Sequence, residues 1–152
     1  MTRIPTLAIA ATAAALVAPG AAAGQEPSYP RCTFSAPKTI KVSAATRTGV
    51  PVRITCNRPS KMLAALDLKF GTRQDDKWAL SHNGGIPGIS RGRPVQIERT
   101  GVAHARLTRA AGRFLNRYPR SAVYVHVAAQ NPEHPERYKD VANRRLVTFL
   151  GR

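Results

Sequence analysis

The stretch with the clearest alternation in the chain is Gly49–Cys56, which reads GVPVRITC. Its valines, its isoleucine and its cysteine occupy every second position, and proline, arginine and threonine occupy the positions between them. A period of two places the first set on one face of a β-strand and the second set on the other face. Branched side chains suit a pleated, half-buried surface. We therefore expect a central strand of a β-sandwich, with Cys56 turned toward the core.

Residues 1–23 have the organisation of a secretory signal peptide. Arg3 precedes an apolar run, Leu7–Val17, and small residues follow up to Ala23. A basic start, an apolar middle and a small-residue cleavage site are the three parts of such a signal. The apolar run is shorter than the ~20 residues that a spanning helix needs. We expect cleavage after Ala23 and a protein that is secreted or associated with the cell wall rather than integral to a membrane.

The chain is strongly basic. It has 24 Lys and Arg residues against 8 Asp and Glu, a formal net charge of +16. Removing Arg3 with the signal peptide leaves 23 basic and 8 acidic residues, hence +15. Such a charge favours acidic partners. Outside a cell these are wall polymers, acidic polysaccharides, anionic lipid surfaces and free nucleic acid.

The chain has two cysteines, Cys32 and Cys56, and both follow the signal peptide. In an oxidising compartment two cysteines are more often paired than free. The bridge would join Cys32, in a leader segment 24–37, to the end of the central strand and would stabilise the fold by roughly 3 kcal/mol. The sequence has no CxxC spacing, so we expect neither a metal site nor a catalytic role for these residues.

Two alternating segments flank the central strand. Lys38–Ala44 is predicted as a strand, and so is Lys61–Phe70, for which a helix is the alternative because the segment is rich in helix formers. Asn57–Ser60 has the composition of a tight connection. We therefore predict a hairpin in which Gly49–Cys56 and Lys61–Phe70 are neighbours.

The segment Gly71–Pro94 is rich in glycine and proline and is predicted to be irregular, with a short edge strand at Lys77–Leu80 as a possibility. Thr108 is a good N-cap for a helix that Pro119 ends. The facing of the last strand stays open, because two sets of apolar residues compete for the core. The elements predicted after Pro94 are strands Val95–Glu98 and Val102–Leu107, helix Arg109–Arg117, strand Ser121–Ala129, loop Asn131–Asp140 and strand Ala142–Leu150.

Strands, one helix and then two more strands, without a βαβ rhythm, indicate a mainly β fold, an antiparallel sandwich with one short crossover helix. The order resembles the immunoglobulin-like β-sandwich modules of exported actinobacterial proteins. The matching segments, within residues 38–152, are VPVRITC, LAALDLKF, ARLTRAAGRFLNR, AVYVHVAAQN and RRLVTFL. Many such modules carry a second cysteine directly after the first, where this chain has Asn57–Ser60. The resemblance implies a non-enzymatic binding or structural module with no catalytic residues and no cofactor.

Arginines follow one face of the predicted helix. Arg109, Arg113 and Arg117 recur at every fourth position, and Arg106 precedes them. Guanidinium groups bind phosphate and carboxylate through paired hydrogen bonds. These four arginines are our candidate ligand-binding residues, and an anionic polymer of the cell envelope is the partner we expect. The alternative is an ordinary solvated helix face.

Other chemistries have weaker support. His104 and His126 lie on the predicted outer faces of strands, where a cross-strand pair would suit a small basic nuclease, our alternative function. Nucleic acid is disfavoured as the main partner, because the chain has only 4 Phe, 4 Tyr and 1 Trp for stacking. A protease inhibitor presenting Gly71–Pro94 is a third possibility. Gly88–Gly92 matches GxSxG by letters but lacks the strand–turn–helix context.

Overall fold

The structure of the protein is a computed structural model that describes residues 28–69 and 88–151. The predicted signal peptide, residues 1–23, and the predicted edge strand Lys77–Leu80 lie outside the described residues. The elements are β1 (Cys32–Ser35), β2 (Thr39–Lys41), α1 (Val42–Arg47), β3 (Val50–Cys56), β4 (Ser60–Leu68), β5 (Ser90–Arg91), β6 (Val95–Ile97), β7 (Thr100–Leu107), α3 (Arg109–Arg117), β8 (Val123–Gln130), β9 (Tyr138–Asp140) and β10 (Arg145–Leu150).

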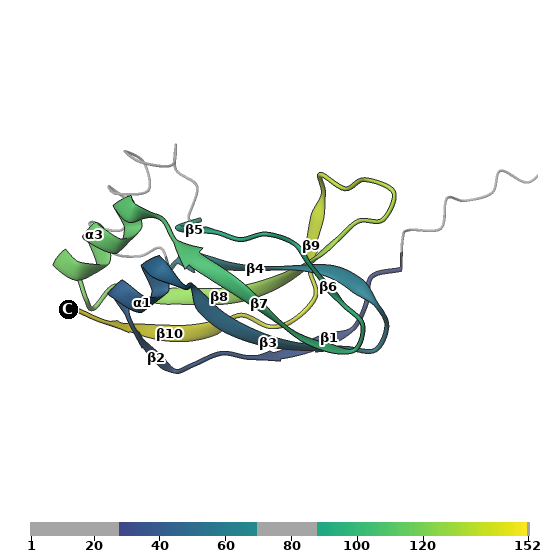
Figure 1. Ribbon diagram of the computed structural model, residues 1–152, viewed down its shortest axis with the longest axis horizontal. Coiled ribbons are helices and arrows are strands. Elements are labelled where there is room, and N and C mark those ends of the chain that lie inside the picture. The colour runs from purple at the N-terminus through teal and green to yellow at the C-terminus, as the bar shows by residue number, and fades with distance from the viewer. Residues whose placement is uncertain (1–27, 70–87, 152) are drawn as a thin grey trace, which may run out of the picture.

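Within these residues the strands form two sheets, as the alternation predicts (Figure 1). The four-stranded sheet has the order β1-β3-β7-β5. The six-stranded sheet has the order β2-β10-β8-β4-β6, and β9 pairs with β8. Every strand pair is antiparallel except β2 with β10. The fold is therefore mainly β and is consistent with a β-sandwich.

The core lies between the inward rows of the two sheets. The predicted strands 49–56, 61–70 and 121–129 are confirmed as β3, β4 and β8, and the alternate apolar residues of these strands are buried. Phe70, at the end of the second prediction, lies outside the described residues. Opposing rows of branched side chains fill the space between sheets at crystal-like density. The fully buried members of these rows are Val50, Val52, Ile54, Met62, Leu66, Val123 and Val125.

The predicted hairpin between the central strand and the next strand is wrong. β3 pairs with β1 and β7, whereas β4 pairs with β6 and β8. The connection Asn57–Pro59 therefore crosses from one sheet to the other. The alternate apolar residues of both strands are buried in the core between the sheets. The alternation that predicts each strand therefore does not distinguish pairing within one sheet from placement in two opposed sheets.

The predicted strand Lys38–Ala44 is also corrected. Only Thr39–Lys41 is a strand, and helix α1 begins at Val42. Val42 and Ala45, three positions apart, are buried in place of the predicted alternating row. Small and apolar residues at this spacing allow one and a half turns of helix to pack against α3.

The disulfide Cys32–Cys56 is formed, with an S–S distance of 2.11 Å. The two cysteines are direct partners in the pairing of β1 with β3. Strand β1 belongs to the four-stranded sheet, so the sheet begins inside the segment 24–37 that the sequence assigns to a leader. The bridge fixes this short edge strand to the central strand.

The described end of the glycine-rich segment is more regular than predicted. Ile89 is fully buried, and its amide donates to the carbonyl of Leu66 at 2.9 Å. The Ser90 hydroxyl accepts from the Leu66 amide at 2.8 Å, and β5 pairs with β7. This segment contacts both sheets, because Leu66 belongs to β4. The buried side chain of Ile89 and these hydrogen bonds together anchor the segment to the two sheets.

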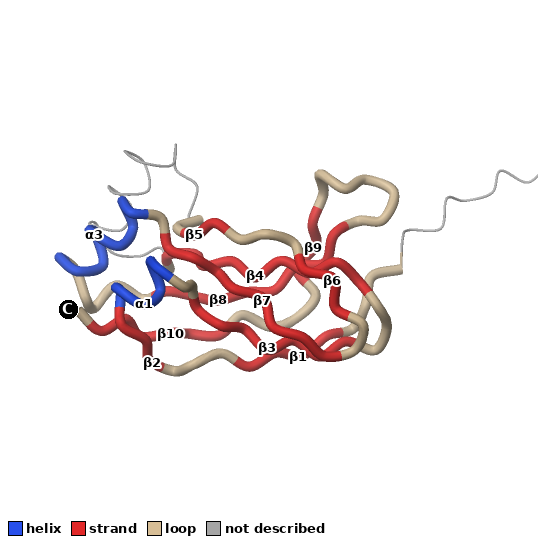
Figure 2. Tube along the Cα trace, viewed as in Figure 1, coloured by secondary structure: helices blue, strands red, loops and turns tan. Residues whose placement is uncertain are grey.

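The predicted helix is confirmed as α3, and the Thr108 hydroxyl accepts from the Ala111 amide at 3.1 Å. The facing of the last strand is settled, since Val147 and Phe149 are buried while Leu146 and Leu150 are exposed. Figure 2 shows α1 and α3 together at one end of the sandwich. That end contains the pocket described next.

Candidate functional site

Arginine side chains gather around an open pocket at the helical end of the sandwich. The pocket has a volume of about 1400 Å³. Six of its lining residues are arginines, and they come from α1, β5, the segment after β5, β7 and α3. We call this site the arginine pocket and define it by Arg47, Arg91, Arg93, Arg106, Arg109 and Arg113.

The β5–β7 pair forms one wall of the arginine pocket. Arg91 and Arg106 are direct partners across the two strands, so their side chains leave the same face. Gly92 brings the chain close to β4, because a Cβ atom there would lie 2.7 Å from the carbonyl oxygen of Ala64. Any other residue would push this segment outward. The glycine therefore allows the segment that carries Arg91 and Arg93 to run close to β4.

Helix α3 supplies a second wall. Arg109 and Arg113 are one turn apart and exposed, while Phe114 and Leu115 on the other face are buried. The cap residue Thr108 also lines the pocket, so the first turn of the helix faces it. The N-terminal end of a helix carries a partial positive charge. That partial charge adds to the guanidinium charges.

Helix α1 completes the pocket with Arg47. Its position depends on close packing between α1 and α3 at Gly112. A Cβ atom at Gly112 would lie 2.8 Å from the hydroxyl of Thr46. Thr46 is held in turn by a hydrogen bond from its hydroxyl to the carbonyl of Val42 at 2.8 Å. The absent side chain at Gly112 thus allows the two arginine-bearing helices to approach.

The charges of the arginine pocket are not balanced by the described part of the chain. No Asp or Glu is among the described lining residues, and none of the six arginines forms an ion pair within residues 28–69 and 88–151. Arg91 and Arg106 are like charges directly opposite each other, and Arg109 and Arg113 are like charges at i, i+4. Each arrangement destabilises a fold by a few tenths of a kcal/mol up to about 1 kcal/mol. An anion in the pocket would reverse the sign of these interactions.

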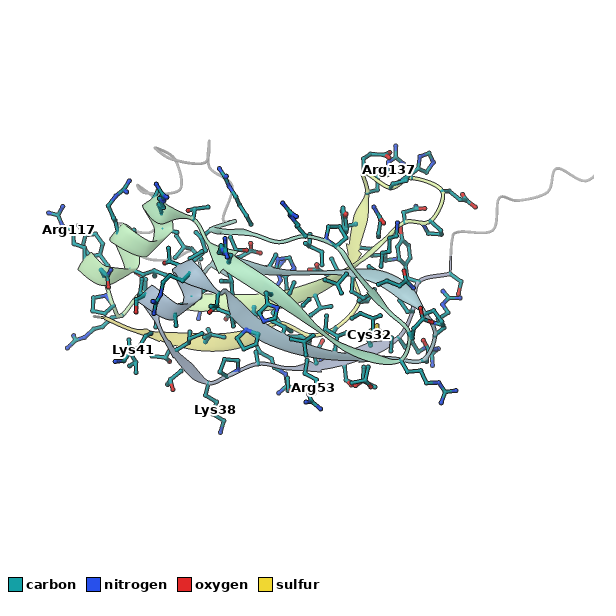
Figure 3. The ribbon with its side chains drawn as sticks, in the orientation of Figure 1. Cys32, Lys38, Lys41, Arg53, Arg117 and Arg137 are labelled. Carbon is teal, nitrogen blue, oxygen red and sulfur yellow. A yellow bond between two sulfur atoms is a disulfide. The ribbon has the colours of Figure 1, made fainter. Side chains whose placement is uncertain are left out.

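The structure separates the four predicted ligand-binding arginines. Arg106, Arg109 and Arg113 line the pocket, whereas Arg117 does not. The guanidinium of Arg117 lies 5.7 Å from the ring centroid of Tyr118, and Figure 3 shows it at the far end of α3. Helical periodicity identified the arginine-bearing face of α3, but the neighbouring strands determine which part of that face borders the arginine pocket.

Three pocket arginines lie outside the predicted set. Arg91 and Arg93 are visible in the sequence as basic residues, but nothing there relates them to the helix. Arg47 is hidden more completely, because it lies between the predicted strands Lys38–Ala44 and Gly49–Cys56, whereas in the structure it is the last residue of α1. Packing of α1 on α3 places Arg47 at the arginine pocket.

The predicted cross-strand pair of His104 and His126 is wrong. His104 is on β7 and lines the arginine pocket, whereas His126 is on β8 in the other sheet. The ring of His126 lies between two carboxylates, with Nε2 at 3.2 Å from Asp67 and Nδ1 at 2.8 Å from Asp140. The sequence shows Asp67 on an outer strand face but not the register that sets it diagonally across from His126.

Two further properties concern only the described residues. No group of three or more His, Cys, Asp or Glu side chains there has the arrangement of a metal site. No helix among those residues has the length and apolar character needed to cross a membrane. No protein-family model, curated protein or solved structure matches this chain.

Proposed function

We propose that the protein is a secreted, immunoglobulin-like β-sandwich module that binds an anionic polymer of the cell envelope through the arginine pocket. The observation that carries this proposal is the convergence of six arginines on one pocket whose described lining contains no acid. The residues 1–23, the disulfide and the strongly basic composition support an extracytoplasmic location.

The pocket suits the anionic groups of a polymer better than its rings. No Phe, Tyr or Trp is among the described lining residues, so these residues offer none of the large aromatic rings on which bases or sugars stack best. Guanidinium groups offer planar, paired donors to phosphate or carboxylate oxygens. Arginines from five segments can contact several charged groups of one chain at once, and a polymer supplies them at high local concentration.

Binding of this kind depends steeply on salt. Each neutralised phosphate of a flexible strand contributes about −0.7 to the slope of log K against log salt. Engagement of all six arginines gives a slope near −4, which is roughly a 300-fold loss of affinity between 50 and 200 mM salt. An uncharged polysaccharide bound through hydrogen bonds would show little dependence on salt.

Cosedimentation with purified cell wall, and titration with polyphosphate and polygalacturonate as defined polyanions, test the proposal at four salt concentrations. We expect saturable binding whose affinity falls steeply with salt. Affinity that is unchanged over this range, or no binding at 50 mM salt to any of the three materials, would contradict it.

Cleavage of a phosphodiester is the second candidate, because His104 lines the same pocket as the arginines. An exposed imidazole beside guanidinium groups could act as a general base on a bound phosphodiester. Incubation of the protein with RNA and DNA separates the two functions. Turnover that is lost in His104→Ala would favour cleavage over simple binding. Unchanged substrate, with polyanion binding retained, would favour the binding module.

A further inference from the structure

A second charged cluster lies in the other sheet and is distinct from the arginine pocket. His126 on β8 is flanked by Asp67 on β4 and by Asp140 on β9. Arg144, which precedes β10, contacts both carboxylates, with nitrogen–oxygen distances of 3.7 Å to Asp67 and 3.3 Å to Asp140. The cluster therefore joins three strands and the segment leading to a fourth through side chains alone.

The geometry of His126 requires two donors. Its Nε2 lies 3.2 Å from the Asp67 carboxylate, and its Nδ1 lies 2.8 Å from the Asp140 carboxylate. A carboxylate can only accept, and a neutral imidazole carries one N–H. Only the protonated ring can donate to both carboxylates. With His126 protonated, the two positive and two negative groups of the cluster also cancel.

Within residues 28–69 and 88–151, the other neighbours of His126 add no competing charge. The direct partner of His126 on β4 is Ala65, and the direct partner of Asp140 on β8 is Ala128. Lys139, next to Asp140, directs its ammonium to the ring of Tyr29 at 5.1 Å. Arg145, next to Arg144, lies over the ring of Phe34 at 5.5 Å. The groups that respond to the charge of His126 are therefore Asp67, Asp140 and Arg144.

Strand β9 depends on this cluster more than the larger strands do. It has three residues, Tyr138–Asp140, all exposed, and among the described strands it pairs with β8 alone. The loop that leads into it, Asn131–Arg137, projects from the sandwich (Figure 1). Three ladder residues without a buried side chain give little stability. The hairpin also has hydrogen bonds from the Gln130 side-chain amide to Pro135 and Tyr138 and from the Val141 amide to the Val127 carbonyl. The contacts of Asp140 with His126 and Arg144 add side-chain links between β9 and the rest of the sheet.

We propose that His126 is a proton-operated latch that holds the β8–β9 hairpin against the six-stranded sheet when protonated and releases it when neutral. Loss of the proton leaves one ring nitrogen with a lone pair facing a carboxylate and gives the cluster a net negative charge. Asp140 is the partner that leaves, since its side chain is 42% exposed whereas that of Asp67 is 11% exposed.

The direction of the pH effect follows from the contacts. The hydrogen bond with Asp67 raises the pKa of His126 above its ordinary value of 6.5, against the opposing effect of burial, and Asp140 raises it further. A raised folded-state pKa means that the stabilisation is complete below the unfolded pKa and is lost as pH rises through the folded pKa. The latch is therefore closed in mildly acidic medium and opens toward alkaline pH.

Hydrogen exchange on the intact protein at pH 6 and pH 9, corrected for intrinsic rates, tests the latch. We expect amides of Tyr138–Val141 to lose protection at least several-fold at pH 9 relative to core amides of β3. In the Asp140→Asn variant, the amides of Tyr138–Val141 should have this low protection at both pH values. His134→Gln is the matched control, because His134 is in the same hairpin, its side chain pairs with Glu136 outside the cluster, and its hydrogen bonds to Asn131 and Arg137 are made by its backbone. This variant should behave like the wild type.

Histidine NMR supplies an independent reading of the protonation state. We expect the His126 ring to carry protons on both nitrogens at pH 6 and on one at pH 9. A neutral ring at pH 6 would overturn the proposal. So would protection of Tyr138–Val141 that is the same at both pH values, or a pH response that persists unchanged in Asp140→Asn.

Discussion

The contact between α1 and α3 at Gly112 leads to one prediction: the hydroxyl group of Thr46 determines whether Gly112→Ala lowers or raises the free energy of unfolding. In a helix interior, alanine is more favourable than glycine by about 0.8–1.0 kcal/mol. At Gly112 the new methyl group would lie 2.8 Å from the Thr46 hydroxyl, which is hydrogen-bonded to Val42 and belongs to a short, stiff side chain. Overpacking of this kind costs about 1–3 kcal/mol. Gly112→Ala should therefore lower the free energy of unfolding by about 1 kcal/mol.

Removing the hydroxyl should reverse that result. In a Thr46→Ala background, the nearest remaining atom to the new methyl group is a Val42 methyl at 3.6 Å, an ordinary contact. Gly112→Ala should then stabilise the protein by up to about 1 kcal/mol, which gives a coupling free energy of about 2 kcal/mol between the two sites. Thr46→Ser keeps the hydroxyl, so Gly112→Ala should remain destabilising in that matched background.

Urea denaturation of the four variants of the cycle and of the serine control, at constant m-value, measures these differences. An effect of Gly112→Ala that is the same in all three backgrounds, within about 0.5 kcal/mol, would refute the packing account. That outcome would also remove the reason for placing Arg47 beside the arginines of α3.

Two further predictions concern stability. Cys32 and Cys56 are 24 residues apart in the sequence. Replacing both by alanine should lower the free energy of unfolding by roughly 3 kcal/mol in the loop-entropy account. Urea unfolding of the wild type under reducing conditions is the control, and an equal midpoint with and without the bridge would contradict the prediction. Thr108→Ala should cost about 1 kcal/mol, because it leaves the Ala111 amide without its cap, whereas Thr108→Ser should cost much less; equal losses for both would show that the cap is not the cause.

The parts of the fold that follow from local pattern could be predicted. Alternation identifies β3, β4 and β8, because one buried face requires a period of two. Thr108 and Pro119 mark the ends of α3 by cap chemistry and ring constraint. Helix α1 could not be found, since a segment of six residues, four of them Ser, Ala or Thr, fits either period, and packing on α3 decides between them.

The relative positions of segments that are far apart in the sequence could not be predicted. The pattern of β3 and of β4 shows that each has an inward face, but not that the two strands belong to different sheets. The same limit applies to His126 and its two carboxylates, which only strand register brings together. The arginine pocket is an intermediate case. Its three predicted arginines lie on α3 and on the strand directly before it. The other three, Arg47, Arg91 and Arg93, are placed there by tertiary contacts that the sequence does not show.

The most direct test of the arginine pocket compares two variants with the same net charge. One replaces Arg106, Arg109 and Arg113 of the pocket by glutamine. The other replaces three arginines around the disulfide, at the end of the sandwich away from the helices (Figure 3). These control residues are Arg31, whose carbonyl accepts from Asn57, Arg58, which follows Asn57, and Arg99, whose carbonyl accepts from Cys56.

Titration of both variants with polyphosphate and polygalacturonate at 100 mM salt is the measurement. If the pocket binds the polymer, its variant loses affinity at least tenfold and its salt slope becomes shallower by about 2, which is three contacts at about 0.7 each. The control variant should keep both the affinity and the slope within about twofold of the wild type. Equal losses in the two variants would mean that net charge alone attracts the polymer, and the pocket would then have no specific role in binding.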